Sequence, residues 1–103
     1  MHRYKFFSAL HKDRVILILK NGNYYSYGNN AKILNYIGFK GNTKKLIDKE
    51  ISYMVIENLD VVDSNIYNNN NYERYIILCK LREVLDNIKD NLYNKSMEDL
   101  DAI

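Results

Sequence analysis

The chain has 103 residues, of which 47% are hydrophobic and 27% are charged, with one cysteine and no proline. That length predicts a single domain with its own core, and one cysteine excludes an internal disulfide bond. No run of about eighteen apolar residues is present, and residues 1–10 lack the long apolar stretch of a signal peptide, so we expect a cytoplasmic protein.

Positive charge is concentrated in the first half of the chain. Residues 1–49 contain ten Lys or Arg and two acids, a net charge of +8, whereas residues 50–103 contain five and eleven, a net charge of −6. The basic half either binds a polyanion such as DNA or is neutralised by the acidic half within the fold. Abundant Asn, Ile and Lys indicate AT-rich coding DNA, a setting that suits an accessory protein of a plasmid or phage.

The first predicted segment fits either of two structures, and the second is a strand. Residues 3–10 fit a short helix, because Tyr4, Phe7 and Leu10 recur every three residues, but they also have a high strand propensity. Residues 15–19 are continuously apolar and rich in β-branched side chains, which predicts a central strand buried on both faces.

A tight turn follows this strand. Asn21-Gly22 favours a two-residue hairpin turn, since both residues tolerate positive φ angles. Residues 23–27 are the predicted return strand, so the sheet is expected to be built on a hairpin over residues 15–27.

A short helix is predicted next, over residues 31–36. Asn29 or Asn30 can cap its start, and Gly38 suits the left-handed position that ends a helix. Residues 43–50 fit either one or two helical turns or a loop.

The middle of the chain predicts a strand followed by a helical piece. Residues 51–56 are apolar and partly β-branched, as in a strand. Leu59, Val62 and Ile66 then suggest a short helix that starts near Asn58.

The last predicted element is a long amphipathic helix. Residues 67–71 include four consecutive asparagines and predict a loop, with Asn71 as the helix cap. From Tyr72, apolar residues recur at helical spacing for about six turns, at Ile77, Leu81, Val84, Ile88 and Leu92. We therefore predict an α+β domain over residues 1–94, with a small mixed or antiparallel sheet, flanking helices and this long helix, and a frayed acidic tail over residues 95–103.

The hairpin region is similar to a known family. Gly22-Asn23-Tyr24-Tyr25-Ser26-Tyr27-Gly28-Asn29-Asn30-Ala31 resembles the pattern Gly-Asp-Phe-Tyr-Glu-apolar-Phe-Gly-acid-Asp-Ala, with one position missing after Ser26. That pattern belongs to the N-terminal mismatch-recognition domain of the DNA mismatch-repair protein MutS. Upstream, Tyr4, Ala9 and His11 match a short helix of that family, and the resemblance covers residues 4–38.

The resemblance implies a mixed sheet with flanking helices and a contact with DNA. In that family the aromatic residue at the Tyr24 position wedges into the duplex and stacks on a mispaired base. The acid two residues later hydrogen-bonds that base, and here Ser26 stands in its place. The specific carboxylate contact is therefore lost, and the clamp, connector and ATPase domains of the family have no counterpart in the chain.

Catalytic chemistry finds little support in the sequence. His2 and His11 are the only histidines, and no acids cluster at ligand spacing, so we expect no metal site and no cofactor. Cys79 fits a small core residue on the last helix better than a nucleophile. We expect a protein that is not an enzyme.

We expect a small non-catalytic DNA-binding protein, with duplex DNA as the favoured partner. Exposed lysines would neutralise phosphates, and tyrosines beside a turn would contact bases, one of Tyr24 and Tyr25 being exposed and the other in the core. A helix over residues 43–50 would also be compatible with a helix-turn-helix variant. The expected nucleic-acid-binding residues are Arg14, Lys20, Tyr24, Tyr25, Ser26, Lys32, Lys40, Lys44, Lys45 and Lys49.

The alternative is a protein-interaction module. Here the C-terminal helix would present a wider apolar strip than its own domain covers, and the chain would form a homodimer or dock to a partner.

Overall fold

Four helices and four strands make up the part of the chain that the structure describes. The computed structural model covers residues 2–101 in this way and gives side-chain environments for residues 3–91. The elements are α1 (His2–Leu10), β1 (Val15–Lys20), β2 (Asn23–Tyr25), α2 (Gly28–Ile37), α3 (Lys44–Asp48), β3 (Tyr53–Glu57), β4 (Asp60–Asn65) and α4 (Tyr72–Asp101). The predicted α+β class with a long C-terminal helix is confirmed, and residues 3–10 are helical.

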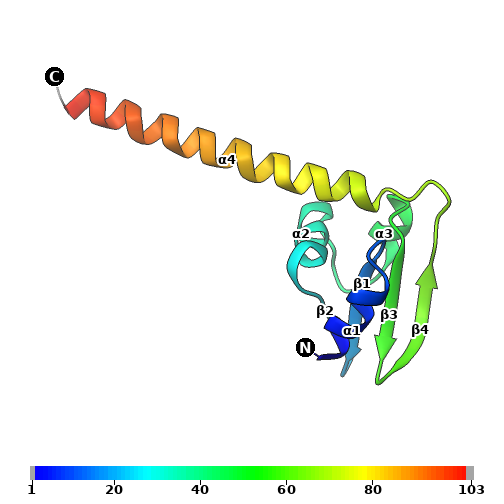
Figure 1. Cartoon of the computed structure of the whole chain (residues 1–103). Helices are drawn as coiled ribbons and strands as arrows, with labels where there is room; N and C mark the ends of the chain where they lie inside the picture. Colours follow the sequence, from blue (N-terminus) through cyan, green and yellow to red (C-terminus); the bar gives the residue numbers. More distant parts are fainter. Residues whose placement is uncertain (1, 102–103) are drawn as a thin grey trace.

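The strands form one mixed sheet in the order β2-β1-β3-β4 (Figure 1). β1 pairs antiparallel with β2 and parallel with β3, and β3 pairs antiparallel with β4. β1 is thus an inner strand, as its continuous apolar run predicts. Val15 and Leu17 enter the larger core, while Ile16 between them enters a smaller core on the other face.

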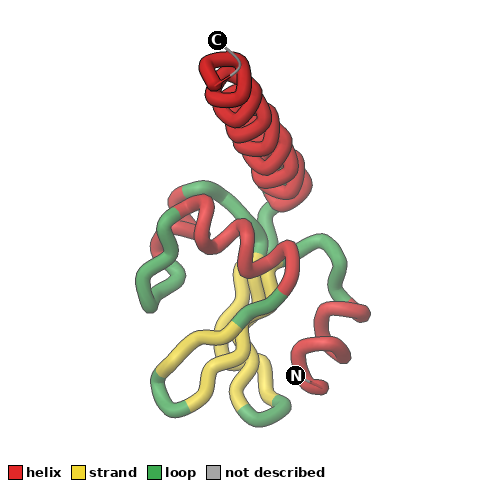
Figure 2. The backbone as a smooth tube through the Cα atoms, turned by 90° about the vertical axis from the view of Figure 1, so that its left-hand side faces the viewer, coloured by secondary structure: helices red, strands yellow, loops and turns green. Residues whose placement is uncertain are grey.

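The two faces of the sheet are covered unequally. α2, α3 and the first turns of α4 cover one face and enclose the larger core with Ile33, Leu46 and Ile76. The nine-residue helix α1 covers the other face, where Tyr4 packs with Ile16, Met54 and Ile56. Figure 2 shows α1 and α2 on opposite sides of the strands. A single short helix cannot cover its whole face, which leaves part of that face open.

The hairpin turn has the predicted chemistry. Asn21 and Gly22 have φ angles of 53° and 76°, the positive values that a two-residue turn requires. β2 ends at Tyr25, earlier than the predicted residue 27. The chain leaves the ladder at Ser26, whose hydroxyl donates a hydrogen bond of 2.8 Å to the Ile16 carbonyl instead.

The predicted asparagine cap of α2 is wrong. The helix starts at Gly28, its N-cap residue is Tyr27, and no side chain caps it. The early start carries Asn30 into the helix and turns it inward, where it is 3% exposed. Its Nδ2 donates to the Tyr4 hydroxyl at 2.7 Å, and its Oδ1 accepts from the Tyr72 hydroxyl at 2.7 Å. This Tyr4–Asn30–Tyr72 network ties α1, α2 and α4 together.

Gly38 ends α2 as predicted. Its φ angle is 73°, and its N–H donates to the Asn35 carbonyl while the Phe39 N–H donates to the Leu34 carbonyl at 2.9 Å. These paired bonds satisfy carbonyls at the end of the helix, and they need a left-handed residue between them.

We predict that Gly38→Ala lowers the free energy of unfolding by about 1–2 kcal/mol, because a Cβ disfavours the left-handed region. The added Cβ would also lie 3.3 Å from the Lys45 amino group. Gly38→Asn is the matched control, since asparagine tolerates this conformation, and it should lose less. Urea denaturation of both variants checks this, and equal losses would contradict it.

The predicted helical piece over residues 58–66 is also wrong, because this stretch is strand β4. Asn58 adopts a φ angle of 56° in the turn after β3, so the chain reverses instead of starting a helix. The helix-like spacing of Leu59, Val62 and Ile66 is overridden by pairing of β4 with β3. β4 is exposed throughout at the edge of the sheet, where acidic side chains and an irregular register disfavour further strand pairing.

The asparagine loop and α4 follow the prediction, but with a different cap. The Asn71 side chain donates to the Lys49 carbonyl at 2.7 Å, so it anchors the loop and does not cap the helix. The Asn70 Oδ1 accepts from the N–H groups of Ser52 and Tyr72 instead. The predicted frayed tail spans residues 95–103. The side chains of these residues, and the backbone of residues 102 and 103, lie outside the described part of the chain.

α4 extends far beyond the rest of the molecule (Figure 1). The molecule measures 63 × 29 × 24 Å, and α4 has thirty residues, a length of about 45 Å. Its first turns contact α2, whereas residues 80–91 are all exposed.

Candidate nucleic-acid interface

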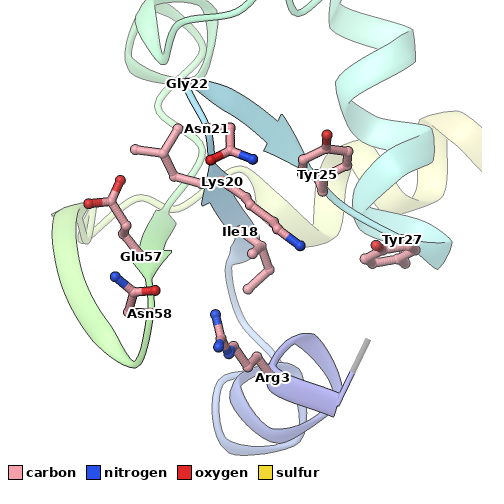
Figure 3. A pocket seen from close by; sticks show the side chains of 10 residues that line it. Arg3, Ile18, Lys20, Asn21, Gly22, Tyr25, Tyr27, Glu57 and Asn58 are labelled. Carbon is pink, nitrogen blue, oxygen red and sulfur yellow. The ribbon is translucent and has the colours of Figure 1, made fainter.

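A concave surface lies at the end of the sheet farthest from α4, between the two hairpin turns and α1 (Figures 1 and 3). We call it the hairpin cleft. Its volume is about 1060 Å³. It is lined by Arg3, Ile18, Leu19, Lys20, Asn21, Gly22, Tyr25, Tyr27, Glu57 and Asn58.

The register of the sheet explains the cleft. Ile18 is the direct partner of Tyr25 in the β1–β2 pair and of Ile56 in the β1–β3 pair, so these side chains lie on the face that α1 covers. α1 buries Ile16 and Ile56 fully. Ile18, nearer the hairpin turn, stays half-buried, and the strand ends beyond it form the floor of the cleft.

Two cations border the cleft. Arg3 extends from α1 toward the strands, and Lys20 at the end of β1 extends along the same opening toward the tyrosines (Figure 3). Both are exposed, and no carboxylate within 4.0 Å pairs with either of them among the described residues. Glu57 supplies the one carboxylate among the lining residues, on the opposite side of the cleft. The Arg3 and Lys20 side of the cleft is therefore positive.

Two tyrosines complete the cleft, and they differ in how far they pack against the rest of the molecule. The ring of Tyr27 packs edge-to-face on Tyr4 with centroids 4.9 Å apart, and the Tyr4 hydroxyl donates to the Tyr27 carbonyl at 2.7 Å. Tyr25 is 45% exposed, with its side chain on the open face of the sheet. The cleft thus offers one fixed and one accessible aromatic ring beside two cations.

Tyr24 and Ser26, which the mismatch-domain resemblance singles out, lie elsewhere. Tyr24 faces the other side of the sheet from Tyr25, as strand alternation predicts, and is half-buried against the larger core. Its ring contacts the Phe39 ring edge-to-face, with the two ring centroids 5.6 Å apart. The Ser26 hydroxyl is engaged by the Ile16 carbonyl.

Two of the predicted basic residues are already paired with acids. Arg14 binds its neighbour Asp13, with Nε 2.8 Å from Oδ1, and this hydrogen bond holds the pKa of the Asp13 carboxyl below its usual value. The Lys32 amino group lies 2.8 Å from the Glu83 carboxylate of α4, which raises the pKa of the lysine. Both charges are largely neutralised where they stand.

The other lysines form a second group, away from the cleft. Lys40, Lys44 and Lys45 are exposed around the turn between α2 and α3, and Lys49 follows α3 at the opposite end of the sheet from Lys20. α3 has five residues, little more than one turn, and its Leu46 is fully buried. It packs on the core, and the Asn42 side chain accepts from the Lys44 N–H at its start.

Sequence reasoning missed Arg3 and Tyr27 as cleft residues. Tyr27 follows Tyr25 by two positions, and this spacing could have placed both on one side of the extended chain. No local sequence pattern identifies Arg3 as a cleft residue, because its position depends on how α1 packs against β1 and β3.

The described part of the chain has no cluster of side chains that indicates a metal site. No three His, Cys, Asp or Glu side chains there come close enough to hold a metal ion. Cys79 is buried in the larger core, and burial raises the pKa of its thiol. Among the described residues, no helix combines the length and the apolar character needed to cross a bilayer.

Comparison with known proteins adds no assignment. No protein-family model, no curated protein and no solved structure matches this chain.

Proposed function

We propose that this protein is a small, non-catalytic DNA-binding protein whose hairpin cleft receives the nucleic acid. The observation that carries the proposal is the meeting of Arg3 and Lys20 with Tyr25 and Tyr27 around one open concave surface. Cations beside accessible aromatic rings suit a phosphate backbone with exposed bases.

The charge of residues 2–71, which we call the domain body, supports the same function. Residues 2–71 contain ten Lys or Arg and six acids, a net charge of +4, whereas residues 72–101 contain five and seven, a net charge of −2. Three of the acids of the body, Glu57, Asp60 and Asp63, belong to the β3–β4 side of the sheet. The exposed Lys40, Lys44 and Lys45 are a further source of backbone contacts outside the cleft.

The proposed contact differs from the one that the mismatch-domain resemblance implies. Tyr24 would have to leave its packing on Phe39 to enter a duplex. Tyr25 needs no such rearrangement, so in this proposal it is the ring that stacks on a base. Stacking on one accessible ring beside a cation is tolerant of sequence, and we expect binding with little sequence preference.

Fluorescence anisotropy with labelled single-stranded and duplex oligonucleotides of equal length tests the proposal. The dissociation constant should rise steeply between about 50 and 200 mM salt. Arg3→Ala and Lys20→Ala should each lower the log–log salt slope by about 1, and Tyr25→Ala should weaken binding about tenfold, mainly where bases are unpaired.

Lys49→Ala is the matched control, because it removes an exposed lysine at the other end of the sheet. It should leave the affinity and the salt slope close to those of the unmodified protein. Failure to bind either oligonucleotide at low salt, or cleft variants that bind as tightly as the control, would overturn the proposal.

A further inference from the structure

Within residues 72–91, α4 carries two apolar faces, and the rest of the described chain covers only one of them. Tyr72, Ile76 and Cys79 are buried against the larger core. Beside them the Tyr75 ring packs on Tyr36, and the Arg82 guanidinium lies over the same Tyr36 ring at 4.5 Å. Farther along α4, the Glu83 carboxylate lies 2.8 Å from the Lys32 amino group of α2.

The second face consists of five apolar side chains that are 50–62% exposed, and we call it the α4 stripe: Ile77, Leu81, Val84, Leu85 and Ile88. A helix turns about 100° per residue, so the stripe lies on the side of α4 opposite to Tyr72, Ile76 and Cys79. A small hollow of about 320 Å³, lined by Leu78, Leu81 and Leu85 of α4 and by Tyr36 of α2, continues the stripe toward the body.

This stripe is unusual for a surface helix. Residues 80–91 touch nothing that buries them, yet an isolated helix of this length is only marginally stable in water. Scattered exposed apolar residues are common, but a continuous apolar row on a projecting helix indicates an interaction surface.

We propose that the stripe binds the same stripe of a second copy of this chain, with the two α4 helices antiparallel. An antiparallel pair centred between Val84 and Leu85 places Leu81 of one copy opposite Ile88 of the other. An apolar residue therefore meets an apolar residue on both sides of the dyad. Such a self-complementary surface is what a two-fold interface requires.

Charge selects this orientation. Residues 72–84 contain three basic and two acidic residues, a net charge of +1, and residues 85–101 contain two and five, a net charge of −3. An antiparallel pair sets the acidic half of each helix beside the basic half of its partner. A parallel pair would set the two acidic halves side by side, which is repulsive.

Sedimentation of the full chain over a range of concentrations tests the pairing. We expect a monomer–dimer equilibrium, and Val84→Glu should raise the dissociation constant of the dimer on the order of 100-fold, since it places charges at the dyad. Asn87→Glu is the matched control, because it adds the same charge on the same exposed segment but off the stripe. Both variants should keep a cooperative unfolding transition by circular dichroism, whereas Val84→Glu should lose helix signal from residues 80–91, because those turns are marginally stable without a partner.

Cysteine cross-linking tests the orientation. Val84→Cys should form a disulfide across the dyad, whereas Ile77→Cys should not, because antiparallel pairing separates the two copies of residue 77 by about 22 Å along the helix. A parallel dimer would cross-link at both positions and would overturn the orientation. A chain that stays monomeric at all concentrations overturns the pairing, and so does a monomer that binds anionic lipid vesicles through the stripe.

Discussion

Replacing Leu46 with alanine should lower the free energy of unfolding by about 3 kcal/mol. Leu46 is the one buried residue of α3, and its side chain is fully enclosed in the larger core. Removing it costs the transfer free energy of the lost methyl and methylene groups and leaves a cavity, which together reach about 2–5 kcal/mol in such cores. A loss of this size is a large part of the stability of a domain of this length.

Ile47→Ala is the control for this prediction. Ile47 is the next residue of the same helix turn, but it is 42% exposed, so its truncation should cost less than about 1 kcal/mol. Alanine has the highest helix propensity, so neither substitution weakens the helix itself, and the two variants differ mainly in burial. Urea denaturation followed by circular dichroism gives both values, and similar losses for the two variants would show that α3 is not anchored through Leu46.

Asn30→Ala should cost about 2–3 kcal/mol through the Tyr4–Asn30–Tyr72 network. The Tyr72 hydroxyl would lose its acceptor while it stays buried, and an unsatisfied buried polar group costs about 1–3 kcal/mol. Burial raises the pKa of Tyr72 to about 12, so its hydroxyl is protonated and needs an acceptor at neutral pH. The Tyr4 hydroxyl keeps the Tyr27 carbonyl as its acceptor.

A double-mutant cycle with Tyr72→Phe separates this network from simple loss of packing. Tyr72→Phe removes only the hydroxyl, but it leaves the buried Asn30 Oδ1 without this donor, so it should cost about 1–3 kcal/mol. The double variant should lose less than the sum of the single losses, because the second substitution removes the stranded hydroxyl. Additive losses from denaturation curves would mean that Asn30 and Tyr72 do not depend on each other.

The elements that the sequence predicted well are those with strong local chemistry. The apolar run at residues 15–19, the Asn21-Gly22 turn and the Gly38 helix end each depend on nearby residues, and each is found in the structure. The helical periodicity that starts at Tyr72 likewise predicts α4.

The elements that the sequence missed depend on contacts between distant segments. Residues 60–65 form a strand because β3 offers a partner, although their apolar spacing suits a helix. Asn30 satisfies two tyrosines from other elements instead of capping its own helix. The hairpin cleft unites α1 with two hairpin turns, and only Lys20 and Tyr25 of the predicted binding residues line it.

The α4 stripe and the domain body lie on opposite sides of α4, and this arrangement determines how a dimer could bind DNA. In an antiparallel pair the two bodies lie outside the helices, at opposite ends, and each cleft lies at the end of its sheet farthest from α4. The two clefts then lie on opposite sides of the paired helices, too far apart to bind neighbouring turns of one straight duplex. If both proposals hold, the dimer is a tether that joins two separate DNA segments, with the paired helices as the rigid spacer between them.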